Sequence, residues 1–424
     1  MISIHQALLR LNQVRPQLGI ERLALAHSLG RTLAEPIDAP IDLPPFSRSA
    51  MDGYALRSHE TDQAPLLLDL KGKVAAGEHL GSLDLQSAVR IFTGAPLPDG
   101  ADAVLEQEAA REDPVRHQVK IERPVAVGRN VMAKAHQYAQ GDRVYAAGQR
   151  LGSVHVGTLA ALGITTVSVF CPIRVALVQT GNELTQGGHP LGRGSIYEVQ
   201  AIWLPLVIRQ WGGTLTQLVR VGDDLPAIAQ AIETVSSHAD LVLTSGGISV
   251  GDYDFVAQAL ENVAHPLFWR VAMHPGRAVA AAHRDQTLIL ALSGNPQAAL
   301  TSWSTLAGPW WAAIQKGRLQ DQRGRYPLLQ AYPKPTRETR LLRVRRLPEG
   351  LDAALPHSAD VLSDPWNSGY ALVPQGSPPL ASGTMLTYWQ PSGLGGTAPS
   401  WHGTDSDDWP FSPPAEFGEA TDSL

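Results

Sequence analysis

The sequence predicts a multidomain protein of the α/β plus β class, in which an all-β module precedes a doubly wound, mostly parallel α/β domain. First, short apolar runs alternate with helical patterns after residue 170, which is typical of a parallel sheet with helices on both faces. Second, residues 66–125 contain short apolar runs separated by Gly, Pro and Asp, a spacing typical of all-β structure. Third, the length of 424 residues predicts about three domains at roughly 150 residues per domain.

The composition, 44% apolar and 17% charged, is that of a soluble globular protein. The formal net charge of −6 comes from the segment 397–424, which holds six acidic residues and no Lys or Arg, so the rest has 34 residues of each sign. This balance argues against nucleic-acid binding, which favours a basic excess. No apolar run is long enough to span a membrane, and Cys171 is the only cysteine. We therefore expect a cytoplasmic protein with no internal disulfide.

The segment 397–424 combines Pro, Ser, Gly and Asp with four aromatic residues. This composition predicts a disordered acidic tail. The alternative is that the interleaved aromatics form a short motif that docks a partner.

The N-terminal region begins with helical patterns at residues 4–11 and 24–33, and prolines between 36 and 45 then end helical structure. The phrase S-A-M-D-G-Y-A follows at 49–55. It is either a turn in which Asp52 and Gly53 supply special backbone geometry or part of a functional site. Residues 148–163 again have a short helical pattern.

The α/β domain is predicted from strands that each end in a polar loop. These strands are expected at 174–179, 214–221, 241–243 and 287–292, with helices at 196–211, 225–235, from 255 onward and from 296 to about 310. A further strand pair is expected at 268–273 and 278–282.

Ligands of such sheets lie outside the carboxyl ends of the strands. We therefore expect the loop residues that follow these strands to converge: Thr180, Glu183, Asp223, Ser249, Asp254 and Ser293. A strand, a Gly/Ser loop and a helix N-terminus form an anion site, and nearby carboxylates can hold a hydrated cation. This predicts a phosphorylated ligand handled with a metal. Each loop alone is also compatible with ordinary turn chemistry, and no dinucleotide or P-loop fingerprint is present.

Five phrases carry a family resemblance. They are P-F-S-R-S-A-M-D-G-Y-A, R-I-F-T-G-A-P-L-P-D-G-A-D-A-V, T-G-N-E-L, S-G-G-I-S-V-G-D-Y-D-F and G-N-P. In this order, and over nearly the whole chain to Gly396, the sequence resembles the molybdopterin molybdenumtransferases of the MoeA type, which include the enzymatic domain of gephyrin.

The resemblance implies an elongated N-terminal domain (1–44 and 141–170), an inserted β module (45–140), an α/β molybdopterin-binding domain (171–320) and a C-terminal β-barrel (325–396). It also implies a homodimer whose cleft is shared between the α/β domain of one subunit and the β module of the other. The substrates would be adenylylated molybdopterin and molybdate, with Mg2+ as cofactor and AMP as product. Other cofactor-biosynthesis proteins or molybdoenzyme chaperones are further expected partners.

The resemblance also assigns roles to individual residues. The catalytic positions are Asp52, Thr93, Glu183, Asp223 and Asp254, of which Asp52 and Asp254 would hold the metal. The ligand-binding positions are Thr180, Gly181, Ser245, Gly246, Gly247, Ser249, Gly251, His274, Arg277, Ser293, Asn295, Arg345 and Ser358. For Arg345, which lies among other arginines, a solvated strand face is the alternative.

Four positions depart from the family pattern. His274 stands where a molybdate-binding lysine is expected, and Gln137 where a catalytic carboxylate is expected. Ala298 replaces a serine and Gln200 an asparagine. We expect an active or weakly active molybdenum-inserting enzyme. The alternatives are a diverged paralogue that binds or carries molybdopterin or its adenylate without efficient metal insertion, or a dimeric scaffold.

Overall fold

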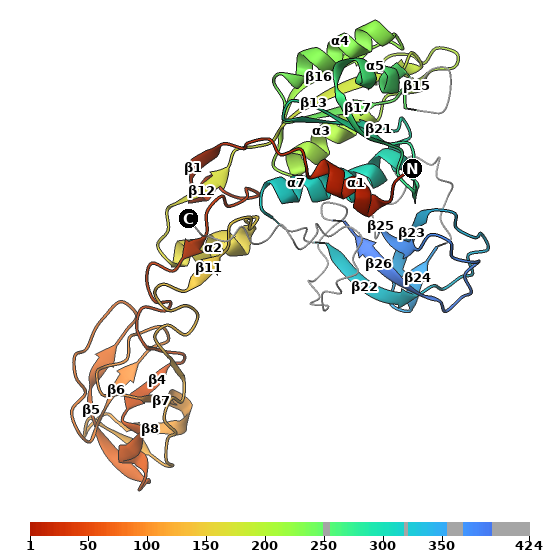
Figure 1. Cartoon of the computed structure of the whole chain (residues 1–424). Coiled ribbons are helices and arrows are strands. Elements are labelled where there is room, and N and C mark those ends of the chain that lie inside the picture. The colour runs from red at the N-terminus through yellow and green to blue at the C-terminus, as the bar shows by residue number, and fades with distance from the viewer. Residues whose placement is uncertain (249–254, 318–320, 354–367, 392–424) are drawn as a thin grey trace, which may run out of the picture.

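The computed structural model describes residues 1–248, 255–317, 321–353 and 368–391. The molecule is elongated (Figure 1). A β module lies at one end, a narrow connecting segment follows, and the α/β domain lies beside a C-terminal sheet at the other end. The predicted tail at 397–424 lies outside the described residues.

The connecting segment is built by strands that are distant in sequence. β1 (Ile20–Ala24) pairs with β12 (Thr166–Phe170), and β2 (Ile37–Asp38) pairs with β11 (Arg143–Tyr145). The predicted helix at 24–33 is therefore wrong, apart from a 3-10 turn at Leu25–His27. A distant partner satisfies the backbone here, which local periodicity does not reveal.

Two predicted helices of this half are present. α1 (Ile4–Leu11) starts with a capping box at Ser3 and buries Ile4, Ala7, Leu8 and Leu11 against the α/β domain. The helical pattern at 148–163 is α2 (Ser153–Ala161).

The β module has a six-stranded sheet in the order β7-β4-β6-β5-β9-β8. This confirms all-β structure for residues 66–125, interrupted by one 3-10 turn at Gln107–Ala109. The strands are β4 (Gly53–Leu56), β5 (Leu66–Val74), β6 (Ser87–Ile91), β7 (Ala103–Glu106), β8 (Ala110–Asp113) and β9 (Gln118–Ile121). β3 (Arg48–Ser49) and β10 (Val131–Met132) pair where the chain enters and leaves the module.

The α/β domain has a six-stranded sheet in the order β16-β13-β17-β21-β20-β18, whose first four strands are parallel. Separate hydrophobic clusters cover its two faces, as expected for a doubly wound sheet. The strands are β13 (Arg174–Thr180), β16 (Thr214–Val221), β17 (Leu241–Ser245), β18 (His265–Trp269), β20 (Ala280–Arg284) and β21 (Thr287–Leu292). The helices include α3 (Gln200–Gln210), α4 (Leu225–Ser236) and α5 (Phe255–Val263).

Two helix predictions in this domain need correction. The helix expected from residue 196 begins at Gln200, because Ile196–Tyr197 forms β15 and pairs with β14 (Leu184–Thr185). The last helix is divided into α6 (Pro296–Ser302), a π-helical turn at Trp303–Ala307 and α7 (Gly308–Ile314). Trp303 lies in the π turn and packs edge-on against Trp211.

The C-terminal sheet has the order β19-β23-β25-β26-β22, with β24 also paired to β23. Its first strand, β19 (Met273–His274), comes from the α/β region and joins the two parts. The others are β22 (Gln322–Pro327), β23 (Thr339–Leu347), β24 (Gly350–Asp352), β25 (Ser368–Val373) and β26 (Met385–Gln390). A bridge from Leu328 to Leu351 brings the end of β22 beside β24, so the sheet curls. Within the described ranges, no helix has the length and apolarity needed to cross a membrane.

Candidate functional site

The carboxyl ends of the four parallel strands form one edge of the α/β sheet. Register pairs Thr180 with Val221, Gln179 with Ser245, and Ser245 with Leu292. The loops that follow therefore start side by side, which brings Thr180, Asp223 and Ser293 to the predicted edge. Ser249, Gly251 and Asp254 lie outside the described residues.

Close backbone approach explains the glycines of this edge. Gly246 has φ +97°, and a Cβ on it would lie 2.6 Å from the Thr180 carbonyl oxygen. Gly181 has φ +136°, and its Cβ would lie 2.7 Å from a carboxylate oxygen of Glu183. The positive φ favours glycine at both positions; a Cβ on Gly246 would also meet backbone, whereas one on Gly181 would meet the movable Glu183 side chain.

Asn182 joins the loops after β13 and β16. Its backbone N–H donates to Asp223 Oδ2 at 3.1 Å, and its Oδ1 accepts the Asp223 backbone N–H at 3.3 Å. This reciprocal pair fixes the position of the Asp223 carboxylate. Sequence reasoning missed Asn182 as a positioning residue, although it stands within the T-G-N-E-L phrase.

The loop before α6 uses its polar side chains largely for its own structure. Asn295 Oδ1 accepts the backbone N–H groups of Gln297 (2.9 Å) and Ala298 (3.2 Å), so Asn295 is the N-cap of α6. Gln200 Nε2 donates to the carbonyl oxygens of Ser293 and Gly294 at 2.8 and 2.9 Å. Gln200, which replaces the expected asparagine, thus holds this loop at the start of α3.

A second polar group lies where the α/β domain meets the C-terminal sheet. His274 pairs across the strands with Arg340, and the Arg277 guanidinium forms an ion pair with the buried Glu338 at 2.8 Å. Burial, followed by the charge of Arg340, lowers the pKa of His274 below its usual value, while Glu338 acts in the opposite direction. His274 is therefore mainly neutral at pH 7.

Arg345 does not join this group within the chain. Residues 340 and 345 of β23 differ by an odd number, so their side chains lie on opposite faces of a regular strand. They are also separated by about 17 Å at about 3.4 Å per residue. Arg345 instead pairs with Asp352 at 3.1 Å. Arg340 is the arginine that sequence reasoning missed, and Ser358 lies outside the described residues.

The β module holds the third group, Asp52 and Thr93. Gly53 of β4 pairs with Ile91 of β6, which sets the preceding Asp52 beside the following Thr93. The backbone N–H and hydroxyl of Thr93 both donate to Asp52 Oδ1, at 2.8 and 2.7 Å. These bonds lower the pKa of Asp52, so its carboxylate is ionised at neutral pH. No hydrogen bond from a described residue reaches Oδ2.

The two alternatives for the Asp52–Gly53 turn both have a structural basis. A Cβ on Gly53 would lie 2.0 Å from the Leu105 carbonyl oxygen, so glycine is needed for the β4–β7 pairing. The Asp52 carboxylate is exposed, and Thr93 donates both of its hydrogen bonds to one of the two oxygens, Oδ1. Gln137 is exposed, and its backbone N–H donates to the Leu43 carbonyl oxygen at 2.9 Å.

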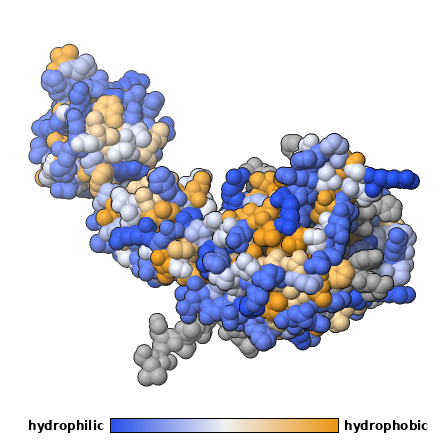
Figure 2. Space-filling view, turned by 90° about the horizontal axis from the view of Figure 1, so that it is seen from above, coloured by the Kyte–Doolittle hydropathy of each residue, from blue (hydrophilic) through white to orange (hydrophobic). Residues whose placement is uncertain are grey.

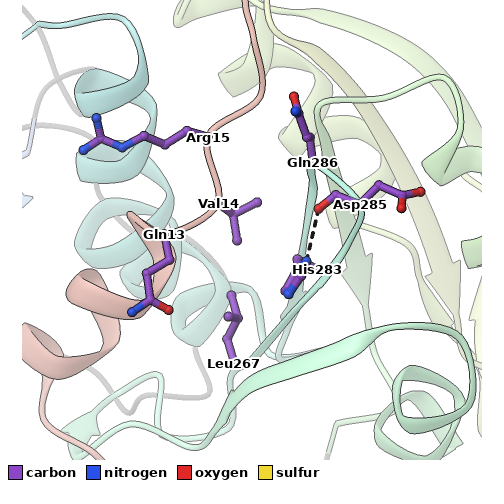
Figure 3. Close-up of a pocket in the computed structure, with 7 residues that line it drawn as sticks. All are labelled: Gln13, Val14, Arg15, Leu267, His283, Asp285 and Gln286. Atoms are coloured by element: carbon purple, nitrogen blue, oxygen red, sulfur yellow. Dashed lines mark hydrogen bonds between the residues drawn. The ribbon is translucent and has the colours of Figure 1, made fainter.

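The groups are far apart within one chain, since the β module and the α/β domain lie at opposite ends of the molecule (Figure 1). Among the described residues, no three His, Cys, Asp or Glu side chains cluster to hold a metal. One cavity of about 240 Å³ lies at the opposite edge of the α/β sheet, beside Gln286, which precedes β21 (Figure 3). None of the predicted site residues lines it.

Two family models cover most of the chain. A model for the MoeA N-terminal region (domain I and II) matches residues 2–163, and one for a probable molybdopterin binding domain matches residues 176–312. Together with the fold, these matches define a MoeA-type protein.

The curated relatives carry one name. Molybdopterin molybdenumtransferase from Haemophilus influenzae is 34% identical over 319 residues, covering 74% of this chain and 78% of the relative. That from Bacillus subtilis is 31% identical over 357 residues, covering 81% and 82%. This chain therefore belongs to the molybdopterin molybdenumtransferase family.

Solved structures support the same fold. Two structures of the molybdopterin biosynthesis MoeA protein from Pyrococcus horikoshii cover 92% of this chain and 98% and 99% of their own. Their TM-scores are 0.72 and 0.79, at 28% and 24% identity.

Proposed function

We propose that this chain inserts molybdenum from molybdate into adenylylated molybdopterin and releases AMP. Membership of the transferase family supports this activity. The main structural support is two groups of residues with fixed geometry, each of which we call a half-site. One is the glycine-rich sheet edge with Asp223 fixed by Asn182, and the other is Asp52 fixed by Thr93.

The reaction breaks a pyrophosphate linkage, which needs stabilisation of developing negative charge more than a covalent nucleophile. The glycines at 181, 246 and 247 allow backbone N–H groups to approach phosphate oxygens closely. We assign adenylylated molybdopterin to this edge, with Thr180, Ser245, Ser249, Gly251, Ser293 and Asn295 as further contacts. Glu183 and Asp223 are its acidic residues.

Asp52 fits Mg2+, which proteins bind through one or two carboxylates plus substrate phosphates. No hydrogen bond from a described residue reaches its Oδ2, and the bonds from Thr93 lower its pKa, which keeps the group anionic. Asp254 is proposed as the second carboxylate. When bound, Mg2+ would neutralise charge on the phosphate that leaves.

Molybdate, as substrate, is assigned to the polar group around His274 and Arg277. Arg277 is about half exposed and is oriented by Glu338, so it can present a fixed positive charge to an oxyanion. Arg345 and Ser358 remain proposed contacts from the C-terminal part.

We propose a homodimer whose cleft combines the α/β domain of one subunit with the β module of the other, because the half-sites are remote within one chain. α3 exposes Ile202 and Leu206, four residues apart on one face, at 62% and 51%. In Figure 2 hydrophobic residues gather on the larger lobe, whereas the β module is mostly hydrophilic. Such a surface suits a second copy of the chain.

The finer organisation belongs to the same proposal. The domains would be 1–44 with 141–170, 45–140, 171–320 and 325–396, the last closing as a β-barrel. A cytoplasmic location fits the single free cysteine, Cys171.

The testing experiment measures AMP release from adenylylated molybdopterin by the purified protein with Mg2+, under anaerobic reducing conditions, with and without molybdate. We expect molybdate-dependent AMP release with molybdenum retained on the pterin. Tight binding of the adenylate without AMP release would refute the transferase and assign the chain as a carrier.

A further inference from the structure

A pair of histidines lies on the sheet of the α/β domain, away from the proposed active site. His265 of β18 and His283 of β20 are directly opposite each other in an antiparallel pair. Their ring centroids are 5.3 Å apart, with an angle of 37° between the planes. β18 is the last strand of the sheet and His265 is exposed, so solvent reaches the pair.

The tautomer of His283 is set by its surroundings. Its Nδ1 lies 3.1 Å from the backbone carbonyl oxygen of Asp285. Because a carbonyl oxygen only accepts, Nδ1 carries the proton, and Nε2 of the neutral ring keeps its lone pair. Metal-ligating histidines commonly make this second hydrogen bond, which also fixes the plane of the ring.

The distance between the rings fits a shared metal ion. Two imidazoles that each place a nitrogen about 2.1 Å from a tetrahedral metal have ring centroids about 5 Å apart. The observed separation matches this value. Simple stacking of the two rings gives a similar separation, so Zn2+ binding is the measurement that distinguishes the two.

A cavity beside His283 has room for further ligands. His283 borders the cavity of about 240 Å³, whose other lining residues include Gln13, Arg15 and Asp285. In Figure 3 the Arg15 guanidinium and the Asp285 carboxylate both point away from His283. Since the described residues offer no third His, Cys, Asp or Glu to complete a cluster, water or a small anion would fill the remaining positions.

We propose that His265 and His283 form a binding site for a divalent transition metal ion such as Zn2+, with two imidazole ligands and an open coordination sphere. Imidazole nitrogen selects late first-row metals over Mg2+, which prefers oxygen. The site is therefore distinct in chemistry and in place from the proposed Mg2+ site at Asp52. It does not depend on the proposed function.

Isothermal titration with Zn2+ tests the site, using untagged full-length protein and the variants His265→Gln, His283→Gln and His238→Gln. His238 is an exposed histidine of the same domain outside the pair, so its variant is the matched control. We expect wild type and His238→Gln to bind Zn2+ equally. Each pair variant should bind at least about tenfold more weakly, since loss of even an outer-shell partner has that effect.

Electron paramagnetic resonance with Cu2+ gives a second measurement. Wild-type protein should show a centre with two equivalent nitrogens, and each pair variant should lose it. Unchanged Zn2+ affinity in both pair variants, an effect in only one of them, or no Zn2+ binding by wild type would each overturn the proposal.

Discussion

His274 stands where a lysine is expected, and unlike lysine it can lose its charge near neutral pH. Its pKa lies below the usual histidine value, so it is mainly neutral at pH 7. A bound dianion stabilises the imidazolium, and binding would then take up a proton. We predict that molybdate affinity rises as pH falls from about 8 to 5.5, by up to about tenfold per pH unit until His274 is protonated in the free protein. Calorimetry in buffers of different ionisation enthalpy measures both the affinity and the proton uptake.

Two variants control this prediction. His274→Lys, charged over the whole range, should bind molybdate with little pH dependence, and His274→Gln should bind weakly at every pH. An affinity of wild type that is flat over this range would show that His274 does not contact the anion.

The role of position 137, where Gln137 replaces an expected carboxylate, can be tested directly by substitution. A neutral amide is a poorer cation ligand than a carboxylate, so Gln137→Asp should raise turnover at limiting Mg2+. The side chain is exposed, so the fold should tolerate the change. Gln63→Asp, an exposed change in the same module, should leave turnover unaltered. An equal rate for wild type and Gln137→Asp would mean that this position no longer serves the metal.

At the residue scale, the sequence indicated the acidic and glycine positions but not all their partners. Motif phrases indicated Asp52 and Thr93, and the loop after the strand at 214–221 indicated Asp223. The positioning role of Asn182 and the place of Arg340 beside His274 depend on which strands are neighbours. Arg340 comes 66 residues after His274, so no local pattern connects them.

At the scale of elements, Gly53 links the Asp52 turn to the stability of the β module. Its substitution by alanine would place a Cβ 2.0 Å from the Leu105 carbonyl oxygen and push β4 away from β7. We predict that Gly53→Ala destabilises the module by on the order of 1–3 kcal/mol. Scanning calorimetry of the full chain should show a lower transition temperature for the β module, with the transitions of the other parts unchanged.

Gly81 supplies the matched control for this substitution. It lies in the same module, and a Cβ there meets no atom within 4 Å. Gly81→Ala should therefore be neutral or slightly stabilising, because alanine restricts the unfolded chain. Equal effects of the two variants would argue against the close approach at Gly53.

Elements with a strong local pattern were predicted well, and those fixed by distant contacts were not. The strands at 214–221 and 287–292 have the predicted bounds. The second is an apolar run buried along its whole length, whereas the first is a partly exposed edge strand delimited by Gly213 and Gly222. The helix predicted at 24–33 is absent because its backbone bonds to residues more than 110 positions later: Leu25 N–H donates to the Thr165 carbonyl oxygen, and Leu33 bridges Val169. The π turn at Trp303–Ala307 was also not predicted; Trp303 within it packs against Trp211, the C-cap residue of α3, and against Trp311 of α7.

At the scale of the whole molecule, the separation of the half-sites predicts that two inactive variants can restore activity when they form a heterodimer. If each cleft joins the β module of one subunit to the α/β domain of the other, Asp52→Ala and Asp223→Ala damage different halves. A heterodimer carrying one variant in each subunit then has one cleft with both changes and one with neither. Purified with two different tags, it should regain about half of the wild-type AMP release, although each parent homodimer is inactive.

The control pairs two changes in the same half. A heterodimer of Asp52→Ala and Thr93→Val has one damaged β module in each cleft, so it should recover no wild-type cleft. Recovery in the first heterodimer and not in the second would establish a cleft shared between subunits, because a site within one chain remains damaged in both. Absence of recovery in the first heterodimer, with dimer formation verified by its two tags, would instead require each chain to bring its own β module and α/β domain together. The narrow connecting segment would then have to bend far from the extended arrangement of Figure 1.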